Sequence, residues 1–367
     1  MDRGGRSPTG TDIVVPMPPP DEHPVGVLLA QIGTPDSPSV PDVRRYLREF
    51  LSDPEVLDMA APARWLLLNT VILPFRPRRT ARAYASIWTE DGSPLTLATD
   101  ALVTGLREEL GPDFVVTAAT STGHPSIVEG VRSLVERGVA RLVVVPLFPQ
   151  FSRATSGGLA GRARRAAEEL GRGSDLVVVP DFPDHPGFIG ATVDLARPRL
   201  EEFDPDHVLF SYHGLPTRQI RQADPSGEWC LTSERCCDAL TERNRHCYRA
   251  QCFATTRALV SALDLRPGEW SVAFQSRMRS QRWIGPFTED TLESLRGEGH
   301  RRLAVFTPSF VADCLETLEE IGIRARDRWL DLGGEDFALI PSVNAHPLWV
   351  EGLATMVRYH AADGASH

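Results

Sequence analysis

The stretch ARLVVVPLF at residues 140–148 decides the fold class of this chain. Its apolar residues are consecutive, which is typical of a parallel strand covered by helices on both faces. Similar runs, separated by helical patterns, form two series along the chain: VGVLLAQIG at 25–33, DFVVTAAT at 113–120 and DLVVVPDF at 175–182, then DHVLFSYHG at 206–214, WSVAFQSR at 270–277, RRLAVFTPSF at 301–310 and FALIPS at 337–342. This alternation predicts an α/β protein with two open parallel sheets.

The length of 367 residues favours two domains over one large core. We expect a first domain at residues 25–197 and a second at 198–360. Residues 1–24 are expected to be a disordered tail, because their segment PMPPPDEHP offers little apolar surface to bury.

The net charge is -10, with 39 Lys and Arg against 49 Asp and Glu, which argues against a nucleic-acid partner. The sequence contains neither a signal core nor about 20 consecutive apolar residues, so we predict a cytoplasmic protein. The most apolar run is WLLLNTVILPF at 65–75. It fits either a buried helix or an apolar lip that covers a ligand or contacts the inner face of a membrane.

Ligands of parallel sheets bind where the strands end, so the residues that follow each strand are the candidate site. His213 ends the strand DHVLFSYHG beside Gly214, and an imidazole there can bind a metal or accept a proton near neutral pH. Glu316 and Glu320 lie four residues apart on a predicted helix and share one face, whereas Glu319 is expected on a solvated face. Imidazole and carboxylate together suit Fe(II).

Other loops after the strands are rich in Pro, aromatic and hydroxyl residues, as in PLFPQFSRATSG around Phe151. Such loops can enclose a flat apolar ligand, and Arg side chains among them can bind its carboxylates. The phosphate-binding patterns GxGxxG and GxxxxGK[ST] are absent, which argues against the simplest nucleotide sites.

Ten segments, in this order, resemble the ferrochelatase family over about residues 25–360: LLAQIGTPDSP, RRYLREFLSDPEVLD, IWTEDGSPL, GHPSI, PLFPQFS, HPGFI, FSYHGLP, FQSR, WIGPFTEDTL and FTPSFVADCLETLEEI. The resemblance implies two Rossmann-like domains, a chelatase-like fold, with a porphyrin cleft between them. It implies insertion of Fe2+ into the porphyrin with release of two protons, as the metal-insertion step of haem biosynthesis.

The resemblance also implies roles for individual residues. His213 and Glu316 face each other across the cleft as proton acceptor and iron-handling carboxylate, both able to bind the iron, and Glu320 continues an acidic relay. The substrate-binding residues that we expect are Ile32, Arg76, Ser93, Phe151, Trp283 and Phe310, with Arg76 and Ser93 near the propionates. Some relatives have His at the position of Cys314, so no second imidazole supports the relay here. Some have Tyr at the position of Ile32, and its absence, together with the segment LSDPEVLD, favours protoporphyrin IX over coproporphyrin III.

Five of the six cysteines lie close together, in an insertion that we place at residues 228–252. A reducing compartment makes disulfides an unsuitable explanation, so metal ligation is favoured. Resembling ferrochelatases sometimes carry a [2Fe–2S] cluster, and we expect one here on Cys230, Cys236, Cys237 and Cys247. Since Cys236 and Cys237 are adjacent, both can bind only from an irregular turn, which leaves Cys252 as an alternative ligand. A structural zinc site with four thiolate ligands is the competing interpretation.

Two other functions stay open at this point. A cobalt or nickel chelatase acting on another tetrapyrrole could use the same His and Glu pair. A non-catalytic haem-binding iron–sulfur protein could use the cysteines alone. The sequence does not predict the oligomeric state.

Overall fold

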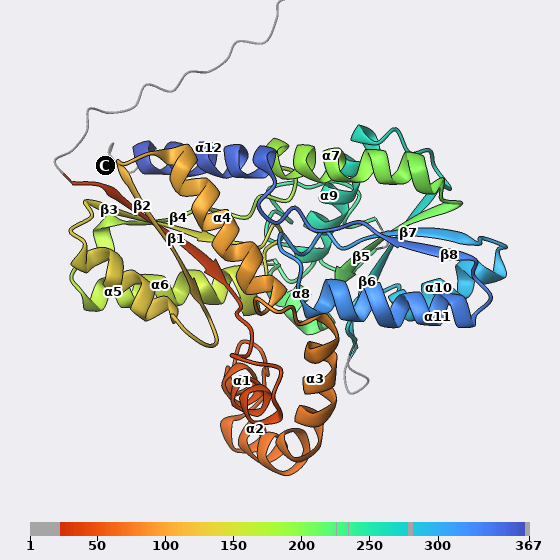
Figure 1. Cartoon of the computed structure of the whole chain (residues 1–367), viewed down its shortest axis with the longest axis horizontal. Helices are drawn as coiled ribbons and strands as arrows, with labels where there is room; N and C mark the ends of the chain where they lie inside the picture. The colour runs from red at the N-terminus through yellow and green to blue at the C-terminus, as the bar shows by residue number, and fades with distance from the viewer. Residues whose placement is uncertain (1–22, 225, 234, 278–281, 364–367) are drawn as a thin grey trace, which may run out of the picture.

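The structure is a computed structural model and describes residues 23–224, 226–233, 235–277 and 282–363. Two four-stranded parallel sheets lie side by side, with helices on their faces (Figure 1). In sheet order, their strands are β2 (Phe114–Thr120), β1 (Val25–Gln31), β3 (Arg141–Pro146) and β4 (Leu176–Val178), then β6 (Trp270–Gln275), β5 (His207–His213), β7 (Arg302–Phe306) and β8 (Asp336–Leu339). The predicted α/β class with two parallel sheets is confirmed.

Both sheets have the same topology, because the first strand of each half lies between the second and the third. The strand order therefore changes direction at β1 in one sheet and at β5 in the other, because the next strand lies on one side of each and the later strands lie on the other side. Ligands of open α/β sheets bind at such switch points, outside the carboxyl ends of the strands. The residues after β1, β3, β5 and β7 are thus the ones that the fold brings to a binding site.

Helices cover the sheets because the central strands are apolar on both faces, as in β3, where five of the six residues are buried. The first half contains α1 (Val40–Ser52), α2 (Ala61–Leu67), the π-helix η1 (Leu68–Ile72), α3 (Leu73–Ile87), α4 (Pro94–Leu110), α5 (Ile127–Glu136), the π-helix η2 (Arg153–Gly157), α6 (Gly158–Glu169), the short 3-10 helix η3 (Gly173–Asp175) and α7 (Pro186–Phe203). The second half contains α8 (Thr217–Gln222), α9 (Tyr248–Ala262), α10 (Thr288–Gly297), the π-helix η4 (Leu315–Ala325), α11 (Arg326–Asp331) and α12 (Pro347–Asp363).

The segment from α1 to α3 projects away from both sheets (Figure 1). It has a small core of its own, in which Val43, Leu47 and Leu68 are buried together with Tyr84. The apolar run at residues 65–75 lies in this projection. Its outer side chains are exposed, Trp65 by 65% and Phe75 by 75%, so the lip interpretation describes it better than a buried helix does.

The last helix, α12, returns to the first half and packs against α4 and α7 (Figure 1). One apolar core runs through both halves and includes Val27 of β1, Phe210 of β5 and Trp349 of α12. The division into domains at residues 197 and 198 stays a prediction, and it falls inside α7.

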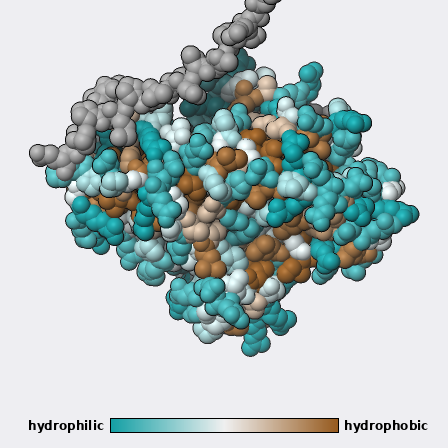
Figure 2. All heavy atoms as spheres, turned by 45° about the horizontal axis from the view of Figure 1, so that its top comes forward, coloured by the Kyte–Doolittle hydropathy of each residue, from teal (hydrophilic) through white to brown (hydrophobic). Residues whose placement is uncertain are grey.

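Figure 2 shows hydrophobic side chains in the middle of the molecular surface between hydrophilic ends. Among the described residues, no helix is long and apolar enough to cross a bilayer. The predicted disordered tail at 1–24 lies outside the described residues, except for its last two positions.

Candidate active site

A cavity of about 1460 Å3 lies at the carboxyl ends of the strands and takes its walls from both halves of the chain. The predicted site residues that line it are Ile32, Arg76, Ser93, His213, Trp283, Phe310, Glu316 and Glu320. The topology explains this convergence, since Ile32 follows β1 and His213 ends β5, the two strands at which the strand order changes direction.

His213 is held in one orientation by its own neighbour. Its Nδ1 lies 2.7 Å from the carbonyl oxygen of Gly214. A carbonyl only accepts hydrogen bonds, so Nδ1 carries the hydrogen and donates it. In the neutral ring Nε2 then has a free lone pair, which is the state that binds a metal or accepts a proton.

Two aromatic side chains flank the imidazole of His213. The ring centroid of Trp283 is 6.5 Å from it and that of Phe310 is 6.4 Å from it, the latter edge to face. Trp283 Nε1 is buried without a hydrogen-bond partner among the described residues. The wall beside His213 is therefore aromatic and apolar, as expected for a flat apolar ligand.

The acidic residues of the cavity come from the π-helix η4 rather than from the α-helix that the sequence suggested. Glu319 and Glu320 are both largely buried, with side chains exposed by 13% and 18%. Arg324 Nε lies 3.0 Å from Glu319, and Arg324 Nη2 lies 3.6 Å from Glu320. The expectation that Glu319 occupies a solvated face was wrong, because the wider helix turns this side chain towards the cavity and its arginine partner.

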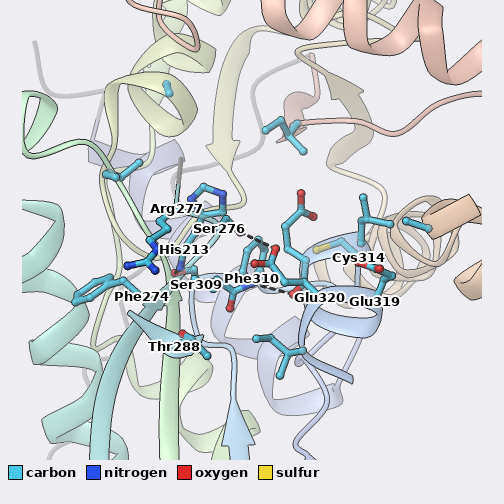
Figure 3. A pocket seen from close by; sticks show the side chains of 18 of the residues that line it. His213, Phe274, Ser276, Arg277, Thr288, Ser309, Phe310, Cys314, Glu319 and Glu320 are labelled. Atoms are coloured by element: carbon cyan, nitrogen blue, oxygen red, sulfur yellow. Dashed lines mark hydrogen bonds between the residues drawn. The ribbon is translucent and has the colours of Figure 1, made fainter. Parts of the chain in front are cut away.

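The loop after β6 holds the π-helix in place (Figure 3). Ser276 Oγ donates a hydrogen bond of 2.6 Å to Glu320, and Gln275 Nε2 donates one of 2.9 Å to the carbonyl of Glu316. Figure 3 shows His213 and Glu320 on opposite sides of one space, with Glu319 and Cys314 beyond Glu320. A proton acceptor and a row of carboxylates thus face a common cavity.

Glu316 extends the acidic row towards the projecting segment α1–α3. The pKa of Tyr84 is raised, mainly by burial and further by the nearby charges of Tyr46 and Glu316. The pKa of Tyr46 is raised by burial and then by Glu316. Tyr46 and Tyr84 therefore stay protonated, and they line the same cavity as Glu316 and the Arg76 cation.

Both halves contribute to a small apolar wall, and the first half adds a hydroxyl pair. Ile32 and Phe310 pack against a buried cluster that includes Leu95 and Cys314. Ser93 is buried, with its Oγ 3.0 Å from Thr34 Oγ1. Thr34 was not among the predicted residues, although its position after β1 could have identified it.

Phe151 is the predicted substrate-binding residue that the structure does not place on the cavity. Its ring lies 5.3 Å from the ring of His246, and its backbone N donates to Gln251 Oε1 at 2.6 Å. The loop after β3 reaches the cavity through Gln150 and Ser152 instead. Phe151 points from the same loop towards the segment that precedes α9.

The four predicted cluster ligands, Cys230, Cys236, Cys237 and Cys247, are all buried and form two close pairs, here called the cysteine cluster. The Sγ atoms of Cys230 and Cys247 are 4.0 Å apart, and those of Cys236 and Cys237 are 3.7 Å apart. Residues 236 and 237 lie in a turn outside any helix or strand, which is the irregular conformation that an adjacent pair requires. Cys252, the alternative ligand, lies one turn into α9 and is fully buried.

The segment around the cysteine cluster is held by side-chain hydrogen bonds rather than by secondary structure. The Asp224 carboxylate accepts from the backbone N of Trp229 at 2.8 Å and of Cys230 at 2.7 Å. Asn244 Nδ2 donates to the Cys236 carbonyl at 3.1 Å. Within the described ranges, no set of three or more His, Cys, Asp or Glu side chains is arranged to hold a single metal ion.

Two residues that the sequence analysis did not identify form hydrogen bonds with the backbone of His213. Tyr248 Oη donates to the His213 carbonyl at 2.7 Å, and His213 N donates to Ser309 Oγ at 3.2 Å. Ser309 follows β7 in the segment TPSF, so its place after a strand was an available signal. Tyr248 starts a helix far along the chain, and no local pattern marks it.

The fold is that of metal chelatases. SirB from Bacillus subtilis, solved with Fe3+, superposes with a TM-score of 0.52 at 10% sequence identity, over 94% of this chain and 98% of that one. The sirohydrochlorin chelatase SirB from Bacillus subtilis subspecies spizizenii, in complex with cobalt, gives a TM-score of 0.51 at 11% identity, over 93% of this chain and 96% of that one. At these identities the likeness shows the fold alone.

Sequence comparison identifies the family within that fold. The family model described as Ferrochelatase matches residues 24–361. A ferrochelatase of Coxiella burnetii (strain CbuG_Q212) is 45% identical over 336 residues, which is 91% of this chain and 93% of that protein. Ferrochelatases of Bdellovibrio bacteriovorus and Azotobacter vinelandii are 41% and 43% identical, over 91% and 90% of this chain and 98% of each relative. The chain belongs to the ferrochelatase family.

Proposed function

We propose that this chain inserts Fe2+ into protoporphyrin IX in the cavity described above and releases two protons. The observation that carries the proposal is the cavity itself, in which the free Nε2 of His213 and the carboxylates of η4 line one space with aromatic walls. Metal insertion needs both kinds of group, because two pyrrole protons must leave and a hydrated cation must lose its water.

His213 is the proton acceptor in this proposal. Its Nδ1 is committed to Gly214, so Nε2 is the atom that takes a pyrrole proton or contacts the iron. The porphyrin loses two N–H protons, its nitrogens bind Fe2+, and the product at the ring centre is neutral. The buried surroundings favour that product, since a neutral centre is better accommodated there than a separated cation.

Glu316 and Glu320 are the metal-handling residues in this proposal. Carboxylate oxygens suit a hydrated divalent cation and can replace its water ligands one at a time. Glu320 accepts a hydrogen bond from Ser276 and lies 3.6 Å from Arg324 Nη2, so these two contacts orient its carboxylate. Glu316 is the member of the row whose charge raises the pKa of both Tyr46 and Tyr84, after the larger effect of burial.

The apolar wall around Ile32 supports protoporphyrin IX over coproporphyrin III as the substrate. Ile32 packs with Leu95 and Phe310 in a cluster without charged side chains. Protoporphyrin IX has vinyl groups where coproporphyrin III has two further propionates, and vinyl groups need no charged partner. Arg76 and the Ser93 hydroxyl remain available near the rim for the propionates that both porphyrins share.

An anaerobic insertion assay tests this function. The full chain is mixed with Fe2+ and either protoporphyrin IX or coproporphyrin III, and metalloporphyrin formation is followed by absorbance. We expect turnover with both, and a higher kcat/KM for protoporphyrin IX. A higher value for coproporphyrin III would overturn the substrate choice, and turnover only with Co2+ or Ni2+ on a more carboxylated tetrapyrrole would overturn the iron assignment.

We also propose that the cysteine cluster holds a [2Fe–2S] cluster. Two thiolates on one tetrahedral metal, each at about 2.3 Å, lie roughly 3.8 Å apart. Both thiol pairs match that separation, at 4.0 and 3.7 Å. Cys247 also interacts with the side chain of Cys237, so the four sulfurs form one group, and four thiolates are the ligand set of a [2Fe–2S] cluster. When bound, such a group supplies a rigid cross-link and a one-electron redox centre.

The spectrum and metal content of anaerobically purified protein decide between these metals. We expect a brown protein with two irons and two acid-labile sulfides per chain. Replacement of Cys230 or Cys237 by Ser should remove the colour, whereas Cys314→Ser should leave it, because Cys314 lies in the cavity wall and not in the cysteine cluster. A colourless protein with one zinc per chain would overturn the assignment.

We further propose that the projecting segment contacts a membrane peripherally. Trp65, Leu66, Val71 and Phe75 are exposed apolar side chains on α2, η1 and α3. Arg78 and Arg82 are exposed on α3 beyond them. An apolar face with adjacent cations fits the interface of an anionic bilayer, and this surface borders the cavity through Arg76 and Arg79.

A further inference from the structure

One helix joins the cysteine cluster to His213. Cys247 is the residue that precedes α9, and Tyr248 is the first residue of that helix. Both side chains are buried, and Cys247 Sγ lies 4.0 Å from Cys230 Sγ. A residue of the cysteine cluster and the residue that touches the His213 backbone are therefore neighbours in the chain.

Tyr248 satisfies a backbone group that the sheet leaves open. The pairing of β5 with β7 ends at Phe210, whereas the pairing with β6 continues to His213. Beyond Phe210, Tyr248 Oη donates to the His213 carbonyl at 2.7 Å and Ser309 Oγ accepts from His213 N at 3.2 Å. Tyr248 Oη is also 2.8 Å from Ser309 Oγ.

These three contacts form a closed ring of hydrogen bonds. Ser309 uses its hydroxyl hydrogen on Tyr248 Oη, Tyr248 uses its own on the His213 carbonyl, and the His213 amide returns to Ser309. The Tyr248 hydroxyl also interacts with the side chain of Cys252. Both backbone polar groups of His213 thus form hydrogen bonds with side chains. Since the imidazole is attached to this backbone, its position in turn depends on these hydrogen bonds.

The rest of α9 is fixed to other parts of the molecule. Gln251 Oε1 accepts from Phe151 N at 2.6 Å, and Thr255 Oγ1 donates to the Pro183 carbonyl at 2.6 Å. Tyr212, beside His213, has its hydroxyl 2.8 Å from Thr256 Oγ1. Since the later turns of α9 are held in this way, a rearrangement at the cysteine cluster is concentrated in the first turn, where Tyr248 lies.

We infer that Tyr248 is a positioning residue that fixes the backbone of His213 and makes the placement of this histidine depend on the state of the cysteine cluster. The inference rests on the proposed role of His213 in metal insertion. It assigns the insertion a task other than iron transfer, because Tyr248 transmits position through hydrogen bonds and contributes no group to the reaction.

The first experiment compares Tyr248→Phe with Tyr212→Phe, in the otherwise intact chain. Each variant loses one buried hydroxyl that bonds across the β5–α9 contact, so both should lower the melting temperature, and by a similar amount. Only Tyr248→Phe should lower kcat, about tenfold, with the porphyrin KM changed less than twofold. Only this variant should also speed amide hydrogen exchange in the peptide that covers residues 207–215. Equal effects of the two variants on kcat and on exchange would overturn the positioning role.

The second experiment tests the coupling with a double-mutant cycle of Cys230→Ser and Tyr248→Phe. Cys230→Ser should speed exchange at residues 207–215 in the wild-type background and change it little when Tyr248 is already Phe. Additive effects would overturn the coupling. If Cys230→Ser does not fold, wild-type and Tyr248→Phe proteins are compared before and after EDTA and dithionite treatment, with the same two outcomes. Since exchange needs no turnover, an inactive wild-type protein would refute the proposed function and leave this test valid.

Discussion

Ser276 Oγ lies 2.6 Å from Glu320 Oε2, so the loop after β6 is bonded directly to the π-helix that carries the acidic row. Ser276 reaches this position with a backbone φ of 64°, in the left-handed region that few residues other than glycine adopt. Strain of this kind is kept where the surrounding structure requires it, often at functional sites. The contact therefore marks Ser276 as a residue that orients Glu320.

Two replacements of Ser276 distinguish the effect of its hydroxyl from the effect of its backbone strain. Ser276→Ala and Ser276→Gly both lose the donor to Glu320, so both should raise the KM for Fe2+ several-fold. Glycine should also relieve the left-handed strain and leave that variant more stable than Ser276→Ala by about 1 kcal/mol. Steady-state kinetics and chemical denaturation check the two effects. An Fe2+ KM unchanged in both variants would contradict the role of this contact.

His213→Ala should abolish metal insertion, with a loss of at least about 100-fold in kcat. The side chain is only partly buried and its polar contact among the described residues is with a neighbouring carbonyl, so thermal unfolding should change by no more than a few degrees. Porphyrin binding, measured by fluorescence quenching, should persist. Full turnover by the folded variant would remove His213 from the mechanism.

Glu316→Gln should lower kcat more than Glu319→Gln does. Both residues line the cavity on the same π-helix, but Glu319 is paired with Arg324 at 3.0 Å, whereas Glu316 lies towards Tyr46, Tyr84 and Arg76. The two changes are matched in size and charge, so a metal-saturation series compares them directly. Equal losses would show that the row acts only through its total charge.

The sequence predicted the sheets well because their signal is local. Runs such as LVVVP are apolar on consecutive residues, and such runs mark buried parallel strands wherever they occur. His213 could be predicted for the same reason, since it stands where a recognisable strand ends. The site could thus be predicted as far as it consists of residues that follow strands.

The remaining features depend on contacts between distant segments. Tyr248 became recognisable only when α9 was seen beside the end of β5, 35 residues earlier in the chain. The prediction for Glu319 was wrong because the direction of its side chain was inferred from the geometry of an α-helix. The segment is a π-helix, in which the same spacing places the side chain in a different direction. Phe151 belongs to a loop that does reach the cavity, but its side chain packs on His246 instead. Composition of a loop does not determine which way each side chain points.

The exposed lip should bind anionic vesicles through its apolar side chains. Phe75→Ser and Trp65→Ser should each weaken co-sedimentation with vesicles that contain phosphatidylglycerol, and should leave stability unchanged because these side chains are already in water. Leu68→Ser is the matched control. Leu68 is only 3% exposed in the same segment, so this change should cost about 2–4 kcal/mol of folding stability. A large loss of stability in Phe75→Ser would show that the lip is packed in solution.

A buried histidine far from the cavity should make the stability of the protein depend on pH. His207, at the start of β5, is 5% exposed, and its Nε2 lies 2.9 Å from Ser271 Oγ. Burial, followed by the nearby His300, lowers the pKa of His207 from 6.5 to about 4. The other charged groups nearby are Asp206, which precedes His207, and Glu298, which pairs with His300 at 3.7 Å.

The folded protein binds a proton on His207 less readily than the unfolded chain does. The contribution of the neutral ring to folding stability is therefore complete above pH 6.5. This stabilisation is lost as the pH falls from 6.5 towards 4, and it amounts to roughly 3 kcal/mol at most. His207→Gln should therefore flatten the decline in unfolding free energy between pH 7 and pH 4, measured by urea denaturation. Ser271→Ala should lower stability at every pH and keep the decline, since the histidine still titrates. A slope that persists unchanged in His207→Gln would assign the decline to other groups.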